Sequence, residues 1–247
     1  MSENVFRMDD PNLPILMLIA KSLGDLCDSL VFVGGCATGL LLTTPRAQAI
    51  RATQDVDVVV HAISTADYHA MEKAVEARGF KHDLSPEAPI CRWVLHGIAL
   101  DLMPSQPGIL GFHNRWYPLA IETAARINLP NGLDIRLITA PVFVATKFEA
   151  FHGRGNNDYL ASHDLEDIIT VVDGRPELLQ EIDQADGELR RYIAAEINTL
   201  LGDRNFLMAL PGHLPGDAAS QARLPELIRR MRAIGNMSQE KNKEPTQ

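Results

Sequence analysis

Residues 53–60 read Thr-Gln-Asp-Val-Asp-Val-Val-Val, a β-branched run in which Asp55 and Asp57 occupy alternate positions. Side chains alternate between the two faces of a strand, so both carboxylates project from one face and the intervening valines from the other. Like charges this close in a half-buried strand repel each other unless a cation lies between them. Mg²⁺ is commonly held by one or two carboxylates together with substrate phosphates. The pattern therefore predicts a magnesium site.

A glycine pair lies upstream, in the run Val-Phe-Val-Gly-Gly-Cys at residues 31–36. Gly34 and Gly35 let the backbone turn tightly after an apolar strand and approach a ligand closely. A helix predicted to begin near Cys36 would direct its first amides at an anion. Alone, a Gly-Gly pair after a strand is most often a turn, and an Asp-x-Asp is most often a solvated strand end. Their combination indicates a phosphate-binding turn that faces a metal site.

A third carboxylate, Asp101, interrupts the short apolar run at residues 98–103. The strand-like segment 90–95 precedes it, and a hairpin between the two would turn at His96 and Gly97. Asp101 could simply cap the loop that follows its strand.

These motifs resemble the nucleotidyltransferases of the DNA polymerase β superfamily. In that superfamily Gly-Gly or Gly-Ser opens a helix, Asp-x-Asp lies on the next strand, and a later strand supplies a third acidic residue. The resemblance implies Mg²⁺-dependent transfer of a nucleoside monophosphate from an NTP to an acceptor hydroxyl, with release of pyrophosphate. It implies Asp55, Asp57 and Asp101 as catalytic metal ligands, and Gly34, Gly35 and Thr53 as nucleotide-binding residues.

A second signature, in residues 145–154 and 162–168, resembles the Lys-x-x-Ala…Arg…Arg-Asp-x-x-Asp-Leu pattern of AbiEii/AbiGii toxin-type nucleotidyltransferases. His163 stands where arginine is common, and Ile168 where leucine is common. In that family the lysine neutralises the triphosphate and the first aspartate supports the active site, so these catalytic roles fall on Lys147 and Asp164. The alternative for Lys147 is a solvent-facing helix lysine. The resemblance further implies an RNA acceptor, the 3′ end of tRNA, and a cognate antitoxin protein as partner.

Other functions share the same core motifs. A small-molecule nucleotidyltransferase of the aminoglycoside type is the closest rival, and a protein acceptor is a further option. A catalytically silent nucleotide-binding module is disfavoured because all three carboxylates and the lysine are present. The net charge of −9 disfavours coating of a nucleic acid duplex but allows a local basic patch. Candidates for such a patch are Arg46, Arg51, Arg92, Arg115, Arg126, Arg136 and Arg154.

Composition indicates a cytoplasmic protein. The three cysteines are odd in number and form no Cys-x-x-Cys pair, which argues for reduced thiols. The apolar run 13–20 is too short to span a bilayer and follows acidic residues, so we expect neither a membrane span nor a signal peptide. We read it as part of an amphipathic helix that ends near Leu26.

The pattern along the chain predicts a mixed α/β (α+β) fold: a nucleotidyltransferase-type mixed sheet flanked by helices, followed by a helical C-terminal region. We expect a catalytic domain over residues 1–140, a helical region over 141–235 that completes the active site, and a disordered tail over 236–247. Ser64 begins a capping-box helix that stops at Gly79. Strands are predicted across 120–140, around a turn at residues 130–132, and Ser162 is read as a helix N-cap.

Overall fold

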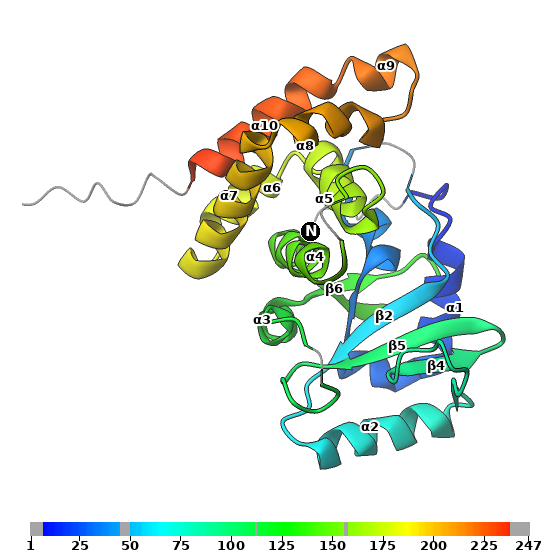
Figure 1. Cartoon of the computed structure of the whole chain (residues 1–247). Helices are drawn as coiled ribbons and strands as arrows, with labels where there is room; N and C mark the ends of the chain where they lie inside the picture. Colours follow the sequence, from blue (N-terminus) through cyan, green and yellow to red (C-terminus); the bar gives the residue numbers. More distant parts are fainter. Residues whose placement is uncertain (1–6, 45–49, 112, 156–157, 238–247) are drawn as a thin grey trace, which may run out of the picture. The chain divides into compact units, whose positions relative to one another are not determined.

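The computed structural model describes residues 7–44, 50–111, 113–155 and 158–237. The chain divides into two compact units, the first made of residues 1–41 and 50–139 and the second of residues 42–49 and 140–247. Within the described ranges, the strands lie in the first unit and the second unit is helical (Figure 1). The predicted mixed α/β sheet flanked by helices, followed by a helical C-terminal region, is confirmed.

A seven-stranded mixed sheet forms the core of the first unit, in the order β3-β4-β5-β2-β1-β7-β6. Its strands are β1 (Leu30–Val33), β2 (Asp55–Val60), β3 (Lys81–His82), β4 (Arg92–Leu95), β5 (Ile98–Pro104), β6 (Ala125–Asn128) and β7 (Asp134–Leu137). The central strand β2 runs parallel to β5 and antiparallel to β1. The two halves of the site sequence, the glycine turn after β1 and the aspartates of β2, therefore belong to neighbouring strands.

The two predicted hairpins are present. In the first, His96 and Gly97 have φ values of 52° and 81°, as a two-residue turn between antiparallel strands requires. This turn fixes the register of β4 on β5, so that Arg92 lies opposite Asp101. In the second hairpin, β6 pairs antiparallel with β7 around a turn that contains Gly132 at φ 80°.

Five helices belong to the described part of the first unit: α1 (Leu13–Leu23), α2 (Thr65–Ala77), α3 (Tyr117–Thr123) and the 3₁₀ helices η1 (Gly24–Asp28) and η2 (Gly35–Leu41). The predicted capping box of α2 is confirmed, with Ser64 Oγ accepting from the Asp67 amide at 3.2 Å and Asp67 accepting from the Ser64 amide at 3.0 Å. The buried Tyr68 hydroxyl donates to the Leu102 carbonyl at 2.8 Å and so attaches α2 to β5.

Some local predictions were wrong. α1 ends at Leu23 rather than near Leu26, because Gly24 adopts φ 58° and breaks the α-helical geometry. The helix after the glycine pair is a seven-residue 3₁₀ helix. α3 occupies the start of a segment predicted as strand, and Pro118 in its first turn favours a helix start there. The two-residue β3 was not predicted, since so short a strand leaves no periodic signal.

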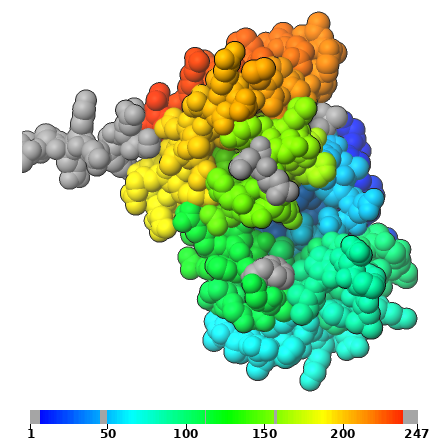
Figure 2. All heavy atoms as spheres, in the orientation of Figure 1, coloured from blue at the N-terminus to red at the C-terminus, as the bar shows by residue number. Residues whose placement is uncertain are grey.

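The second unit is a helical assembly. Its helices are α4 (Ala140–Arg154), α5 (His163–Gly174), α6 (Leu178–Gln184), α7 (Gly187–Gly202), α8 (Arg204–Ala209), η3 (Leu210–His213), α9 (Ala218–Gln221) and α10 (Leu224–Asn236). α7 and α10 lie side by side, as their adjoining yellow and red surfaces in Figure 2 show. Leu227, Met231 and Ile234 recur at helical spacing on the buried side of α10.

Several predictions fall outside the described residues. They concern Arg46 of the candidate basic patch and residues 238–247 of the predicted tail, whereas α10 itself extends to Asn236. No helix in the described part of the chain combines the length and apolar character that a membrane crossing needs. The three cysteines are buried free thiols.

Candidate active site

Three carboxylates lie on one face of the sheet where β2 pairs with β5. Asp57 is the register partner of Asp101, and Asp55 lies two residues earlier on the same side of β2. Val56 and Val58 take the opposite face and are fully buried, which fixes the orientation of the strand. Asp101 is 7% exposed, and the other two aspartates are half-buried. The structure thus brings together the three carboxylates that the sequence predicted.

Arg92 bridges two of these carboxylates from the neighbouring strand β4. Its Nε donates to Asp101 Oδ1 at 2.8 Å, and its Nη2 donates to Asp101 Oδ2 at 2.7 Å and to Asp55 Oδ2 at 2.9 Å. The hydrogen bonds to Asp101, followed by the charges of Asp101 and Asp55, raise the pKa of Arg92 above its ordinary value. A guanidinium fork that is shared by two carboxylates is a strong, charge-assisted arrangement.

Sequence reasoning named Arg92 only as one member of a possible basic patch. The signal that could have found it was present, because a two-residue turn at His96 and Gly97 sets the hairpin register. Counting back from that turn pairs Leu95 with Ile98 and Arg92 with Asp101. Directly opposed residues project from the same face, so the contact follows from the turn.

The chemistry of these carboxylates fits a hard divalent cation, because ionised aspartate oxygens only accept and are the ligands that such cations prefer. Two of the carboxylates already bind a positive group, the Arg92 guanidinium. Asp55, Asp57 and Asp101 are the residues that would hold Mg²⁺. Among the described residues, however, no three His, Cys, Asp or Glu side chains are arranged as a ready metal site. In the first unit, Arg92 takes up carboxylate oxygens of Asp55 and Asp101 that a metal would use.

The glycine turn is fitted to the Asp57 side chain. Gly34 has φ 70°, a conformation that L-residues rarely adopt, and a Cβ built there would overlap the Asp57 carboxylate. The Gly34 carbonyl accepts from the Ala37 amide at 3.2 Å as η2 begins. Gly35 is buried at the start of η2. The first glycine is therefore required both by backbone conformation and by the close approach of a predicted metal ligand.

Thr53 has a positioning role in the structure. Its hydroxyl donates to the Asp55 carbonyl at 3.1 Å, and its amide donates to Asn12 Oδ1 at 2.8 Å. Asn12 is fully buried and donates from Nδ2 to the Arg51 carbonyl at 2.8 Å. Asn12 thus binds the chain on both sides of Ala52 and fixes the start of β2. Sequence reasoning missed it, because an asparagine before an apolar helix reads as an ordinary cap.

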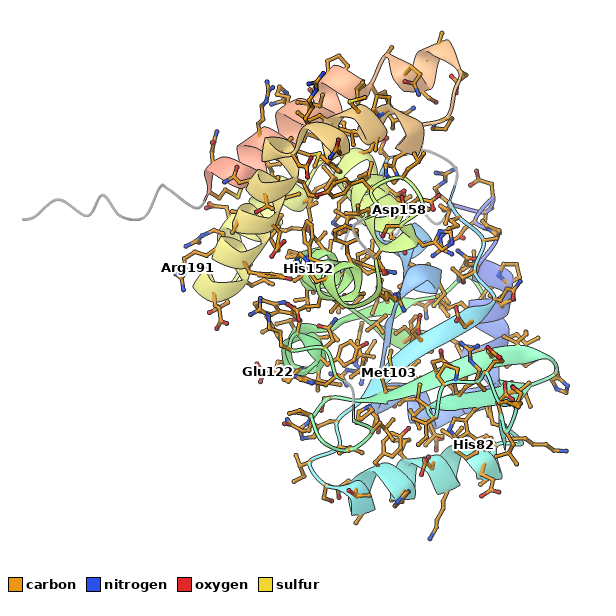
Figure 3. All side chains as sticks on the ribbon, in the orientation of Figure 1. His82, Met103, Glu122, His152, Asp158 and Arg191 are labelled. Carbon is orange, nitrogen blue, oxygen red and sulfur yellow. The ribbon has the colours of Figure 1, made fainter. Side chains whose placement is uncertain are left out.

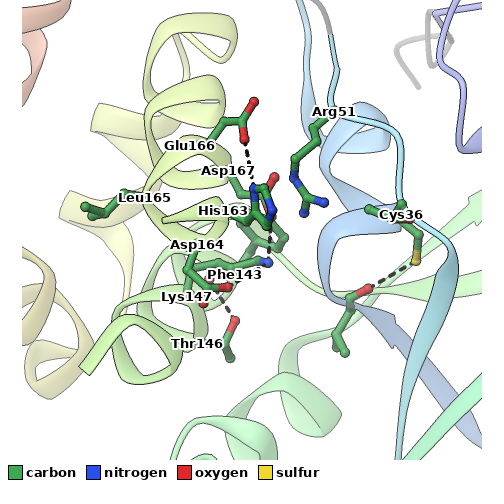
Figure 4. A network of polar contacts seen from close by, with 12 residues as sticks. Cys36, Arg51, Phe143, Thr146, Lys147, His163, Asp164, Leu165, Glu166 and Asp167 are labelled. Carbon is green, nitrogen blue, oxygen red and sulfur yellow. Dashed lines mark hydrogen bonds and ion pairs between the residues drawn. The ribbon is translucent and has the colours of Figure 1, made fainter. Parts of the chain in front are cut away.

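The second unit contains the other predicted pair, Lys147 and Asp164. Figure 4 shows Lys147 of α4 beside α5, where its Nζ lies 3.2 Å from Asp164 Oδ1 and 2.6 Å from Asp167 Oδ2. All three side chains are at most 7% exposed. The predicted alternative, a solvent-facing lysine, is wrong. The ammonium also lies 5.6 Å from the centroid of the Phe143 ring, a favourable cation–π distance.

Arg154 completes this ion-pair cluster. Its Nε and Nη2 donate to the two oxygens of Asp164 at 2.9 and 2.8 Å, in a bidentate pair. Burial raises the pKa of Asp164, but the Arg154 hydrogen bonds and the Lys147 and Arg154 charges outweigh burial and hold that pKa below its ordinary value. Asp167 was missed as a site residue, although its i,i+3 spacing from Asp164 places both on one helix face.

The start of α5 explains why these aspartates are fixed. Ser162 is the N-cap, and its hydroxyl accepts from the Leu165 amide at 3.3 Å, as predicted. Asp164 and Glu166 lie in the first helical turn, where negative charge is favourable. His163 contacts Glu166 at 3.4 Å and is exposed. Residues 162–164, Ser-His-Asp, are therefore the start of α5.

The first unit also has an open depression of about 310 Å³ between α2 and the strands β3 and β4. Its lining includes His69, Glu72, His82 and Trp93, and Figure 3 marks His82 at this edge of the sheet. Trp93 alternates with Arg92 along β4, so the depression and the carboxylates lie on opposite faces. The indole nitrogen of Trp93 is buried without a hydrogen-bond partner among the described residues.

No protein-family model and no curated protein sequence matches the chain. Among solved structures, the antibiotic-resistance factor ANT(2'')-Ia is similar over 66% of this chain and 83% of its own, with a TM-score of 0.41 and 15% identity. A provisionally assigned nucleotidyltransferase from H. pylori is similar over 95% of both chains, with a TM-score of 0.43 and 12% identity. Similarity of this degree does not by itself establish a shared fold or activity.

Proposed function

We propose that the chain is a nucleotidyltransferase that moves a nucleoside monophosphate from an NTP to an acceptor hydroxyl. The observation that supports this most is the convergence of Asp55, Asp57 and Asp101 on one sheet face. The tight turn at Gly34, packed on Asp57, is the second support. These features correspond to the motifs by which the sequence resembles the DNA polymerase β superfamily.

In this proposal Asp55, Asp57 and Asp101 would hold Mg²⁺. When bound, the metal would neutralise the triphosphate and orient it for in-line displacement of pyrophosphate. Asp101 would complete the metal site and help to activate the acceptor hydroxyl. Gly34 and Gly35 would let the backbone approach the nucleotide, and Thr53 would fix the start of the strand that carries Asp55 and Asp57.

The proposed roles of Lys147 and Asp164 come from the resemblance to toxin-type enzymes. Lys147 would neutralise charge on the triphosphate, and Asp164 would support the active site. Within the second unit Asp164 and Asp167 hold the ammonium in place, so Lys147 would take up a phosphate oxygen by exchanging one of these partners. A held ammonium pays less entropy on binding phosphate than a mobile one. Asp167 joins the proposed site residues for this reason.

The proposed acceptor is RNA, the 3′ end of tRNA, with a cognate antitoxin protein as partner. Binding one RNA end requires only a few phosphate contacts, which a local basic patch can supply on a chain of net charge −9. The same negative charge also suits a cationic small molecule, so an aminoglycoside-type acceptor is the second candidate.

The acceptor is tested by incubating the protein with Mg²⁺ and each α-³²P-labelled NTP, in the presence of total tRNA or a panel of aminoglycosides. Label on tRNA supports the RNA acceptor. Label on an aminoglycoside supports the second candidate and removes the toxin-like role. If the protein binds NTP in a Mg²⁺-dependent manner but labels neither tRNA nor an aminoglycoside, both proposed acceptors are wrong. Absence of NTP and Mg²⁺ binding in calorimetry contradicts the enzyme itself.

A further inference from the structure

Asp55, Asp57 and Asp101 lie on one face of the sheet, here called the carboxylate face. Arg92 is a cation that is ion-paired with this face. It uses two of its three guanidinium nitrogens, Nε and Nη2, to bind Asp101 and Asp55. Its third nitrogen, Nη1, makes no hydrogen bond to the described residues of the chain. The side chain is 25% exposed, whereas that of Asp101 is 10% exposed. The Nε and Nη2 donors are therefore committed to carboxylates, and Nη1 can donate to an anion.

Charge balance makes this arrangement sensitive to ligands. Asp55, Asp57 and Asp101 share a sheet face with Arg92, and Arg92 binds two of the three. A divalent cation and the guanidinium need the same oxygens of Asp55 and Asp101, and the two therefore compete. Once a metal is bound there, the most favourable partner left for the arginine is an anion close to the same carboxylates. The triphosphate of a metal-bound nucleotide is such an anion.

We propose that Arg92 is a positioning residue of the reaction, which binds Asp55 and Asp101 in the free protein and transfers its fork to the triphosphate when metal and nucleotide bind. The inference rests on the proposed nucleotidyl transfer. A planar guanidinium fits phosphate as well as carboxylate in a bidentate manner, so the exchange keeps the number of charge-assisted bonds. Because β4 is paired with β5, the arginine stays beside the carboxylates throughout the exchange.

The exchange predicts opposite effects on two ligands. Replacing Arg92 by glutamine removes the competitor of the metal, so metal alone binds more tightly. The same replacement removes a phosphate ligand, so nucleotide with metal binds more weakly. A merely structural arginine would weaken both, because its loss would disorder the carboxylates. The sign difference therefore separates the two roles.

The test measures binding rather than turnover. Mn²⁺ has the same preference for oxygen ligands as Mg²⁺ and is followed by electron paramagnetic resonance. We expect Arg92→Gln to bind Mn²⁺ about fivefold or more tightly than the unmodified protein, since a competing state is removed. In calorimetry with Mg²⁺ and a non-hydrolysable NTP analogue, we expect about tenfold weaker nucleotide binding, the effect of one lost charge-assisted pair.

Two further variants act as controls. Arg191→Gln removes an exposed arginine of α7 (Figure 3) and should leave both affinities unchanged. Arg92→Lys keeps the charge without the fork, so it should shift both affinities in the same directions as Arg92→Gln by smaller factors. It is also the variant to use if Arg92→Gln does not fold, because it still compensates the carboxylates.

The outcomes are separable. If the unmodified protein binds Mg²⁺ and nucleotide but Arg92→Gln binds Mn²⁺ no more tightly, or nucleotide no more weakly, the exchange is wrong while the proposed function stands. If both Arg92 variants lose both ligands, Arg92 is structural and the exchange is wrong. If the unmodified protein binds neither metal nor nucleotide, the proposed function fails.

Discussion

Asp57 and Gly34, two of the predicted site residues, constrain each other's position. The carboxylate occupies the space that a side chain at Gly34 would need, and the glycine adopts a backbone conformation that other residues avoid. The glycine turn thus limits where Asp57 can place its oxygens. A metal ligand has to be held within a fraction of an ångström, and a steric stop of this kind provides such a limit.

Gly34→Ala is expected to lower both stability and transfer. The left-handed conformation costs about 1–2 kcal/mol for alanine, and overlap with Asp57 adds to that cost. Gly132→Ala is the matched control, since Gly132 has φ 80° and no atom within 4 Å of its added Cβ. Urea unfolding should show a larger loss for Gly34→Ala than for Gly132→Ala, and only the former should impair transfer. Equal losses would contradict the steric role of Asp57.

The ion pairs of Asp164 predict a pH dependence of stability. Its folded pKa lies below the unfolded value of about 3.9, so these pairs stabilise the fold above that value and lose their effect as pH falls through the folded pKa. Asp164→Asn should cost about 3 kcal/mol at pH 7, because it leaves buried Lys147 with one fewer partner.

Urea unfolding from pH 7 to pH 3 measures this difference. The gap between the unmodified protein and Asp164→Asn should narrow below about pH 4, as the wild-type carboxylate is protonated. Glu87→Gln, at an exposed position, should show no gap at any pH. A gap that is constant over the whole range would mean that the ion pairs do not stabilise the second unit.

Two elements carry the carboxylates, and each was predicted from sequence for a physical reason. β2 follows from alternation within a β-branched run, and the β4–β5 hairpin follows from its two-residue turn. Periodicity identifies such elements because burial acts on one face of each. The glycine-pair helix was predicted in the right place but not in its 3₁₀ form.

Contacts that no motif marks were beyond sequence reasoning. Asn12 binds residues about 40 positions away, and no local pattern specifies that pairing. Buried polar side chains of this kind are chosen by tertiary packing. In contrast, Lys147, Asp164 and Asp167 lie on two consecutive helices at regular spacing, which is why a motif could point to them. The sequence did not specify the ion-pair partners of the site carboxylates, such as Arg92 for Asp101 and Arg154 for Asp164.

The capping box at the start of α2 predicts a measurable loss of helix stability. Ser64→Ala removes the acceptor for the Asp67 amide and should lower the free energy of unfolding by about 1 kcal/mol. Ser22→Ala, within α1, removes a hydroxyl that only donates to its own helix at Leu18 and should be neutral or slightly stabilising. Chemical denaturation of both variants checks this. A cost for Ser22→Ala as large as that for Ser64→Ala would contradict the capping role.

At the scale of the whole molecule, a chain of net charge −9 is proposed to bind a polyanionic nucleotide. Binding therefore has to rely on local positive groups and a metal rather than on the overall field. In the first unit Arg92 already pairs with Asp55 and Asp101, so both of these carboxylates have a cationic partner when no metal is bound. Each unit has its own apolar core.

Removal of metal should therefore abolish transfer without unfolding the protein. We expect excess EDTA to leave the midpoint of thermal unfolding within about 2 °C of its value in Mg²⁺, because metal binding contributes little to the fold. Circular dichroism melts, alongside a transfer assay, measure both quantities. Unfolding on chelation would show that the metal is structural and would contradict the proposed role of Arg92 as counter-ion.

The central claim is that the carboxylate face performs nucleotidyl transfer, and the position of the label in the NTP tests it most directly. Parallel reactions contain NTP labelled at the α- or the γ-phosphate, Mg²⁺ and total tRNA, with the unmodified protein or Asp57→Ala. We predict that α-label enters the acceptor, that γ-label appears only in pyrophosphate, and that Asp57→Ala is folded but at least about a thousandfold slower. Transfer of γ-label to the acceptor, or equal transfer by a folded Asp57→Ala protein, would contradict the claim.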